Sequence, residues 1–142
     1  MNLSYLSLSG LDFSGAKFVG ADLTHVDLNN ANLKGADFRR AILKDASIEG
    51  AQLQGARFTD ANVYCVSFDR SDLSNADFTN ADLTIAILVG VNLKGAVLNN
   101  AELTGANLEG ADIAGASFTN AKTDKIKNLE KAVNRTKAIG LP

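Results

Sequence analysis

Residues 16–40 read AKFVG ADLTH VDLNN ANLKG ADFRR and contain the pattern that decides the fold. In each block of five, the first residue is small and the third is large and apolar. The third position is Leu, Phe, Ile or Val in every block from Leu3 to Phe118. An α-helix repeats every 3.6 residues and a strand every 2, so neither element produces a period of five. The sequence therefore predicts a solenoid built from five-residue units.

The remaining positions of the unit predict a chain that turns after each short extended step. From Ala16 to Ala121 the first position is usually Ala, which is small enough to face inward beside the large apolar residue. The fifth position is most often Gly or Asn, and these residues tolerate the positive φ that the third residue of a type II turn requires. Four such steps close a square, which makes one coil of the solenoid.

Two columns of residues test whether the chain returns beneath itself after four units. One column contains a phenylalanine every 20 residues, with Leu98 as the single exception: Phe18, Phe38, Phe58, Phe78 and Phe118. A second column alternates in charge, as expected for outward neighbours on adjacent coils: Lys17, Asp37, Arg57 and Asp77. Both columns predict coils of four units, six of them before residue 122.

Several triplets carry a resemblance to a known family: Ala21-Asp22-Leu23, Ala31-Asn32-Leu33, Ala76-Asp77-Phe78, Ala81-Asp82-Leu83 and Ala106-Asn107-Leu108. The pattern resembles the pentapeptide-repeat family over residues 3–121. The resemblance implies an all-β fold, a right-handed quadrilateral β-helix. Similar proteins include DNA-mimicking inhibitors or protectors of type II topoisomerases, and cyanobacterial and chloroplast members with no known role.

The pattern divides the chain into a β-helix over residues 1–121 and a C-terminal segment over residues 122–142. Thr123 stands where the next large apolar residue is due, and Asp124 is a suitable helix N-cap. Helical spacing follows in Ile126, Leu129, Ala132 and Val133, and Gly140 with Pro142 is a stop signal. A solenoid end exposes apolar residues and strand edges. We therefore expect a capping α-helix across the last coil.

The first coil has no such cover and is rich in leucine: Leu3, Leu6, Leu8 and Leu11. Leu6 and Leu11 occupy the position where Ala is usual. We expect this edge to pair with a second copy in an isologous homodimer.

Composition excludes several classes of protein and site. The 142 residues include one Cys and one His, which exclude an internal disulfide and a four-ligand zinc site. The net charge of −2 does not indicate a nucleic-acid or membrane partner, and no apolar run approaches the ~20 residues of a membrane helix. We expect no cofactor or metal, and a cytoplasmic location; a lumenal or periplasmic location is the alternative if a targeting segment has been removed.

Charge separates the two parts of the chain. Residues 1–121 carry 8 basic and 14 acidic residues, whereas residues 122–142 carry 6 and 2. DNA mimicry needs a dense row of carboxylates, but neutral residues dilute the acidic column: Asp12, Asn32, Gln52, Asp72, Asn92 and Asp112. Binding to a type II topoisomerase is therefore the weaker functional alternative.

One outward column places His25, Asp45 and Cys65 at intervals of 20, the residue types of a nucleophilic triad. His25 and Cys65 would lie two coils apart on a rod without a pocket, so we expect no catalytic residues and no enzymatic activity.

From Tyr5 to Ile85 the residues of this column replace the Gly or Asn expected in turns. Because Ile85 is β-branched, we expect a different turn type at this corner. The candidate partner-contact residues lie on or near it: Ile42, Tyr64, Cys65, Ile85 and Ile87. The sequence therefore favours a non-enzymatic scaffold that binds a protein partner, although unconstrained surface drift would produce the same residues.

Overall fold

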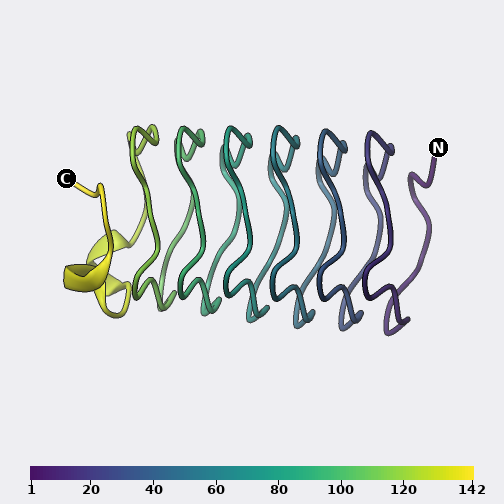
Figure 1. Cartoon of the computed structure of the whole chain (residues 1–142), viewed down its shortest axis with the longest axis horizontal. Helices are drawn as coiled ribbons and strands as arrows, with labels where there is room; N and C mark the ends of the chain where they lie inside the picture. Colours follow the sequence, from purple (N-terminus) through teal and green to yellow (C-terminus); the bar gives the residue numbers. More distant parts are fainter.

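The computed structural model describes residues 1–142 as a stack of square coils with an irregular segment at the C-terminal end (Figure 1). The helical elements are two single-turn 3-10 helices, η1 (Leu129–Lys131) and η2 (Arg135–Lys137). The β-structure consists of isolated parallel bridges, one on each side of each coil. None of the helices has the length and apolarity needed to span a bilayer.

The register of the stack is constant throughout the repeat. The second residue of each unit pairs in parallel with the second residue of the unit 20 positions later, from Asn2 with Asp22 to Asn107 with Lys127. The predicted coil of four units is confirmed. Each outward residue therefore has neighbours 20 positions before and after it on the same side of the rod.

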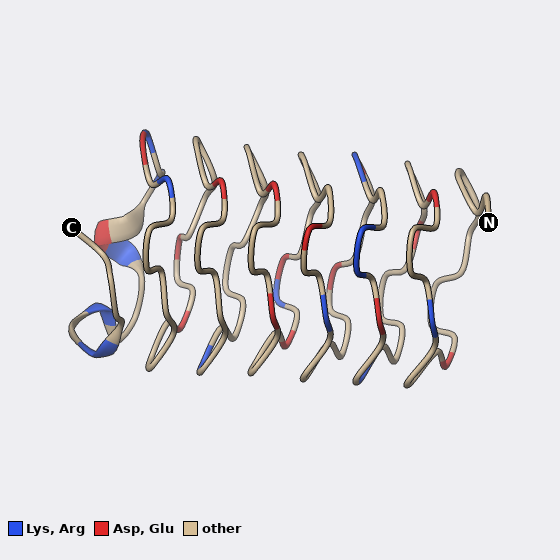
Figure 2. Cartoon of the chain, turned by 45° about the horizontal axis from the view of Figure 1, so that its top comes forward, with Lys and Arg blue, Asp and Glu red and all other residues tan.

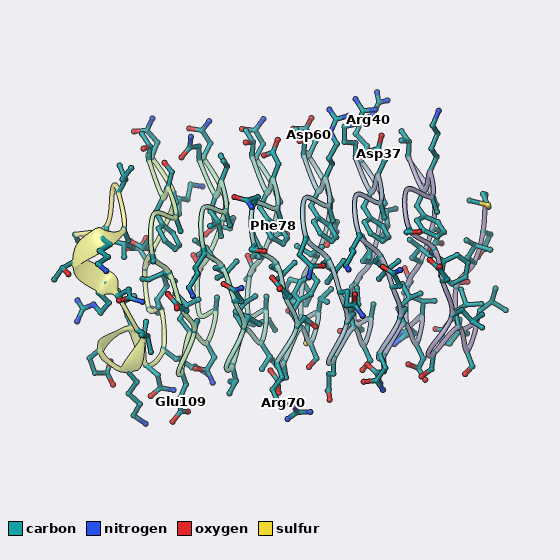
Figure 3. All side chains as sticks on the ribbon, turned by 60° about the horizontal axis from the view of Figure 1, so that its bottom comes forward. Asp37, Arg40, Asp60, Arg70, Phe78 and Glu109 are labelled. Carbon is teal, nitrogen blue, oxygen red and sulfur yellow. The ribbon has the colours of Figure 1, made fainter.

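One continuous core fills the rod from Phe18 to Phe118, and it consists of the first and third residues of the units. The phenylalanines stack face to face, with ring centroids 5.0 Å apart for Phe18–Phe38, 4.8 Å for Phe38–Phe58 and 4.6 Å for Phe58–Phe78. Figure 3 shows Phe78 inside the rod and Arg40, Asp60 and Arg70 at its outer edges. The predicted inward positions are confirmed.

Acidic and amide residues at the second position brace the turn that follows them. The Asp22 carboxylate accepts a hydrogen bond from the backbone N–H of Thr24 at 3.0 Å, and the Asp82 carboxylate accepts one from Thr84 at the same distance. Such local side-chain bonds are typical of Asp and Asn in turns. They explain why these two residue types recur before the large apolar residue.

The fifth residue of every unit has the left-handed backbone conformation. This includes the corner of Ile85, for which the sequence predicts another turn type. The φ angle is 60° at Tyr5, 56° at Cys65 and 50° at Ile85. The prediction of a different turn at Ile85 is wrong. The reason is the series of backbone hydrogen bonds between coils, which we call the ladder. The Ile85 N–H donates to the carbonyl of Thr104 on the next coil at 2.9 Å, as the equivalent N–H does at other corners, and this bond holds the corner in the common conformation.

The predicted C-terminal α-helix is also wrong, because residues 122–139 continue the stack as a seventh coil. Lys122 and Lys127 pair with Glu102 and Asn107 at the usual spacing of 20. Val133 and Ile139 then pair with Asp112 and Ser117 at spacings of 21 and 22, and η1 and η2 lie in the stretches that carry the extra residues.

Hydrogen bonding explains this departure from helical periodicity. The sixth coil presents backbone N–H groups, and Leu103 donates to the carbonyl of Lys122 while Leu108 donates to that of Lys127. A helix would have used those carbonyls internally and left the edge of the sixth coil unpaired. The apolar residues with helical spacing pack on the core from the coil instead, among them Ile126, Leu129 and Ala132. The segment covers the end of the rod, but as a coil.

Candidate functional site

The five candidate contact residues lie on three successive coils around one corner of the rod, and we call them the corner patch (Ile42, Tyr64, Cys65, Ile85 and Ile87). Cys65 and Ile85 occupy the same corner on adjacent coils, since the Cys65 N–H bonds to the carbonyl of Thr84. Ile87 faces outward on the following side, paired with Ser67 and Asn107. Ile42 faces outward on the preceding side, next to Asn62. Whether a partner binds there stays a prediction.

Three isoleucines of the corner patch are exposed well beyond the core: Ile42 by 44%, Ile85 by 39% and Ile87 by 37%. Two neighbours shape the patch. The ammonium of Lys44 lies 5.7 Å from the centre of the Tyr64 ring, and Gly105 leaves room for Ile85, because a β-carbon there would lie 3.1 Å from Ile85 Cγ2. Lys44 is not among the residues predicted for the patch, although it stands 20 positions before Tyr64 in the same column and was predictable from that spacing.

His25, Asp45 and Cys65 do form one column, but their geometry does not activate a nucleophile. His25 Nε2 lies 3.8 Å from Asp45 Oδ2, and the His25 ring stacks on Tyr5 at 4.8 Å. Burial, and then the adjacent Asp45 carboxylate, raise the pKa of the Cys65 thiol. A reactive cysteine needs the opposite shift toward thiolate. The structure has no group of three or more His, Cys, Asp or Glu side chains placed to hold a metal ion.

A pocket that is open to solvent lies at the C-terminal end of the rod, away from this column. Six residues of the last coil line it: Asn134, Arg135, Thr136, Ala138, Leu141 and Pro142. It therefore offers no enclosed space beside the His25 column.

Carboxylates and basic side chains are interspersed along the rod (Figure 2). Asp37 is held by Arg39, whose Nη2 lies 2.7 Å from its Oδ2, and by the more distant Arg57 at 4.0 Å. Ion pairs neutralise further carboxylates: Glu49 with Arg70, Glu102 with Lys122, Glu109 with Lys131 and Asp112 with Lys94. The charge alternation predicted the contact of Asp37 with its column neighbour Arg57 but not the shorter contact with Arg39.

The Asp37 contacts predict a pH-dependent contribution to stability. Hydrogen bonding from Arg39 lowers the pKa of the Asp37 carboxyl to about 2. We expect Asp37→Asn to lower the free energy of unfolding by about 1–2 kcal/mol at pH 7. A lowered pKa means that this stability is present above the ordinary Asp pKa near 3.9 and is lost as pH falls through about 2.

Urea unfolding at pH 7 and pH 3 measures this difference. Arg39→Gln should reproduce most of the loss at pH 7, and Arg57→Gln little of it, because its contact is longer. A deficit for Asp37→Asn that does not shrink in acid would contradict the assignment.

The leucines of the first coil lie at the uncovered N-terminal end. Leu6 is exposed by 43% and Leu11 by 49%, while Leu3 and Leu8 are half-buried and pack against the core from one side. The dimer expected from them stays a prediction.

Several solved structures are similar to this chain over most of its length. HetL, a pentapeptide repeat protein involved in heterocyst differentiation regulation from the cyanobacterium Nostoc sp. strain PCC 7120, is 25% identical with a TM-score of 0.55, over 94% of this chain and 77% of its own. Rfr23 from the cyanobacterium Cyanothece 51142 is 30% identical with a TM-score of 0.44, over 84% of this chain and 64% of its own.

QnrB1, a plasmid-mediated fluoroquinolone resistance protein, is 22% identical in a trypsin-treated form, with a TM-score of 0.48, over 90% of this chain and 77% of its own. No curated protein sequence matches the chain. The model of the family described as pentapeptide repeats matches residues 7–45, 21–60, 51–84 and 86–122. The stack of square coils is thus a right-handed β-helix, and the chain belongs to the pentapeptide-repeat family.

Proposed function

We propose that this protein is a non-enzymatic scaffold whose corner patch binds an apolar surface of a partner protein. The rod is rigid, because each coil is held to the next by backbone bonds on all four sides. Its outward second positions carry mostly polar residues, so exposed Ile42 and Ile87 depart from the rule on both sides of one corner. An exposed apolar cluster on such a surface supports a binding role.

The observation that carries the proposal is the left-handed backbone conformation of Ile85, a β-branched residue. Its φ of 50° is the left-handed conformation, which costs an L-residue about 1–2 kcal/mol and costs a β-branched residue most. Gly stands at the equivalent corner on the next coil, Gly105, without such a cost. Backbone strain retained at an exposed apolar residue is typical of functional surfaces.

The strain predicts a difference between two matched substitutions. Ile85 and Ile87 are almost equally exposed, but only Ile85 has a positive φ. We expect Ile85→Gly to leave the free energy of unfolding within about 0.5 kcal/mol of the parent, and Ile87→Gly to lower it by about 1–2 kcal/mol. Urea unfolding of the two variants measures the difference, and equal losses would show that Ile85 is not strained.

Affinity capture from the native host, followed by quantitative mass spectrometry, tests the binding role. The Tyr64→Ser/Ile85→Gly variant should lose at least one protein that the parent captures. Val97→Ser is the matched control, because Val97 is also an apolar residue at the second position of its unit but lies on another side of the rod, paired with Asp77 and Ser117. Identical sets of captured proteins for all three chains would refute the corner patch as a binding site and favour surface drift.

DNA mimicry has less support as a second function. Five aspartates fall within little more than one coil: Asp60, Asp69, Asp72, Asp77 and Asp82. They are distributed over different sides and corners, and Arg57, which lies between Asp37 and Asp77 in the same column, reduces the negative charge of that side. A supercoiling assay with DNA gyrase separates the two functions, since only a mimic inhibits or protects the enzyme.

A further inference from the structure

The edge of the first coil presents backbone groups that have no partner. In later coils the second residue of each unit bonds twice to the coil before it: the Asp22 N–H donates to the carbonyl of Met1, and the Asp22 carbonyl accepts from the N–H of Leu3. Both groups of such a residue therefore point toward the N-terminal end. In the first coil the equivalent residues have neither bond: Asn2, Ser7, Asp12 and Lys17.

Apolar side chains fill the space inside this edge. Leu6 and Leu11 are exposed, and Leu3, Leu8 and Phe13 are only partly buried, whereas the equivalent residues of the next coil are buried. Figure 1 shows the first coil without a covering segment at its outer side. An open strand edge with unpaired groups and adjacent apolar residues is a template for pairing with another chain.

A second copy of this chain has the backbone groups that such an edge needs. Residues that present both N–H and C=O to one side exchange two hydrogen bonds with an opposite residue in an antiparallel ladder. Two copies placed end to end about a two-fold axis wind with the same hand, so the sides that meet run antiparallel. All four sides of the first coil can then pair by the same rule.

The shape of the edge selects one position for the two-fold axis. The first coil is a ramp that rises by one strand spacing, roughly 4.8 Å, before residue 21 stacks on Met1. The edge has a step at the corner of Gly20, where the end of the first coil lies one strand spacing above its start at Met1. Two such edges stay equally far apart on all four sides only when the two-fold axis passes through this corner and through the opposite corner, at Gly10. Every other choice leaves at least one pair of sides a full strand spacing farther apart.

This position also matches polar groups across the interface. Ser7 faces the partner's Asp12, and Asn2 faces the partner's Lys17. No like charges meet, whereas an axis through the middle of two opposite sides sets Asp12 against the partner's Asp12, or Lys17 against the partner's Lys17. A hydroxyl facing a carboxylate and an amide facing an ammonium can both hydrogen-bond.

The apolar residues match in the same register. Leu11 faces the partner's Leu8, and Leu6 faces the partner's Phe13, so the most exposed leucines of the edge meet apolar side chains. We propose that the protein forms an isologous homodimer through the edge of its first coil, with the two-fold axis at Gly10 and Gly20. The proposal is independent of the corner patch, which lies on the later coils.

Sedimentation analysis of charge variants at low salt tests both the dimer and its register. Ser7→Lys should tighten the dimer, because the new ammonium meets the partner's Asp12, and Ser7→Asp should weaken it. At Asn2 the signs reverse: Asn2→Asp tightens the dimer against the partner's Lys17, and Asn2→Lys weakens it. Each change occurs twice in the dimer, so we expect shifts in Kd of about threefold to thirtyfold.

General repulsion between two negatively charged chains cannot produce this pattern. Asn2→Asp adds negative charge to a chain of net charge −2, yet it is expected to tighten the dimer. The double variant Ser7→Asp/Asp12→Lys should recover the association that Ser7→Asp loses. The same signs at positions 2 and 7 would overturn the register.

Two further variants decide which end associates. Leu11→Asp places a carboxylate against the partner's Leu8 and should leave a single chain. Ile139→Asp, at an exposed residue of the opposite end, should leave the dimer unchanged. The proposal is overturned if the parent remains a single chain up to roughly 1 mM, or if Ile139→Asp dissociates a dimer that Leu11→Asp preserves.

Discussion

Phe58→Ala should lower the free energy of unfolding by about 3–5 kcal/mol, the largest effect expected of a single substitution in this chain. The ring is fully buried, and it stacks between Phe38 at 4.8 Å and Phe78 at 4.6 Å. Removing it deletes apolar contacts and leaves a cavity that the ladder cannot close. The coils are held a strand spacing apart by hydrogen bonds on every side. Urea unfolding followed by circular dichroism measures the loss.

Phe58→Leu is the matched control, because leucine occupies the same column at Leu98 and is fully buried there. We expect it to cost much less than the alanine variant, since it keeps most of the apolar volume. A loss below about 1 kcal/mol for Phe58→Ala would contradict the stacked column.

Ala76→Leu should lower the free energy of unfolding by about 1–3 kcal/mol, for the opposite reason. Ala76 is completely buried, and its neighbours on the adjacent coils, Ala56 and Ala96, are completely buried as well. Three additional carbons have no space in a column of methyl groups unless the coil shifts. A shift would stretch ladder bonds such as that from the Val97 N–H to the Ala76 carbonyl, which is 2.9 Å long.

Ala114→Leu tests whether the cost comes from the inward position. Ala114 belongs to a turn on the outside of the rod and is only partly buried, so the same change should be nearly neutral there. Thermal unfolding of both variants provides the comparison. Equal stability of Ala76→Leu and the parent would mean that the first position of the unit is not tightly packed.

The repeat made most of the fold predictable. A residue at a given position of the unit has the same role in every coil. The spacing of Phe18 and Phe38 alone therefore placed them in one column. The contact between Asp37 and Arg57, which are neighbours in one column on adjacent coils, followed in the same way, and the structure confirms it. Arg39 was missed because it lies within the same coil as Asp37, where the spacing between coils carries no information.

The candidate site was predicted as a set of residues but not as a conformation. The placement of Ile85 at the same corner as Cys65 followed from the period. Its turn did not, because the intrinsic preference of a β-branched residue points away from positive φ. The neighbouring coils supply hydrogen bonds that hold the corner in one shape, and those bonds overcome the preference of a single residue.

The amino-acid pattern by itself determined the period, the inward columns and the coil of four units, because each follows from which side chains can be buried together. Tertiary structure alone decided the turn conformation at Ile85 and the conformation of residues 122–142, which form a seventh coil instead of a helix. In isolation that segment has the apolar spacing of a helix. Beside the sixth coil it meets a row of unpaired backbone groups, and pairing with them keeps it in the stack. In both cases the conformation is determined by backbone hydrogen bonds between parts of the chain that are distant in sequence, and no local sequence pattern predicts such bonds.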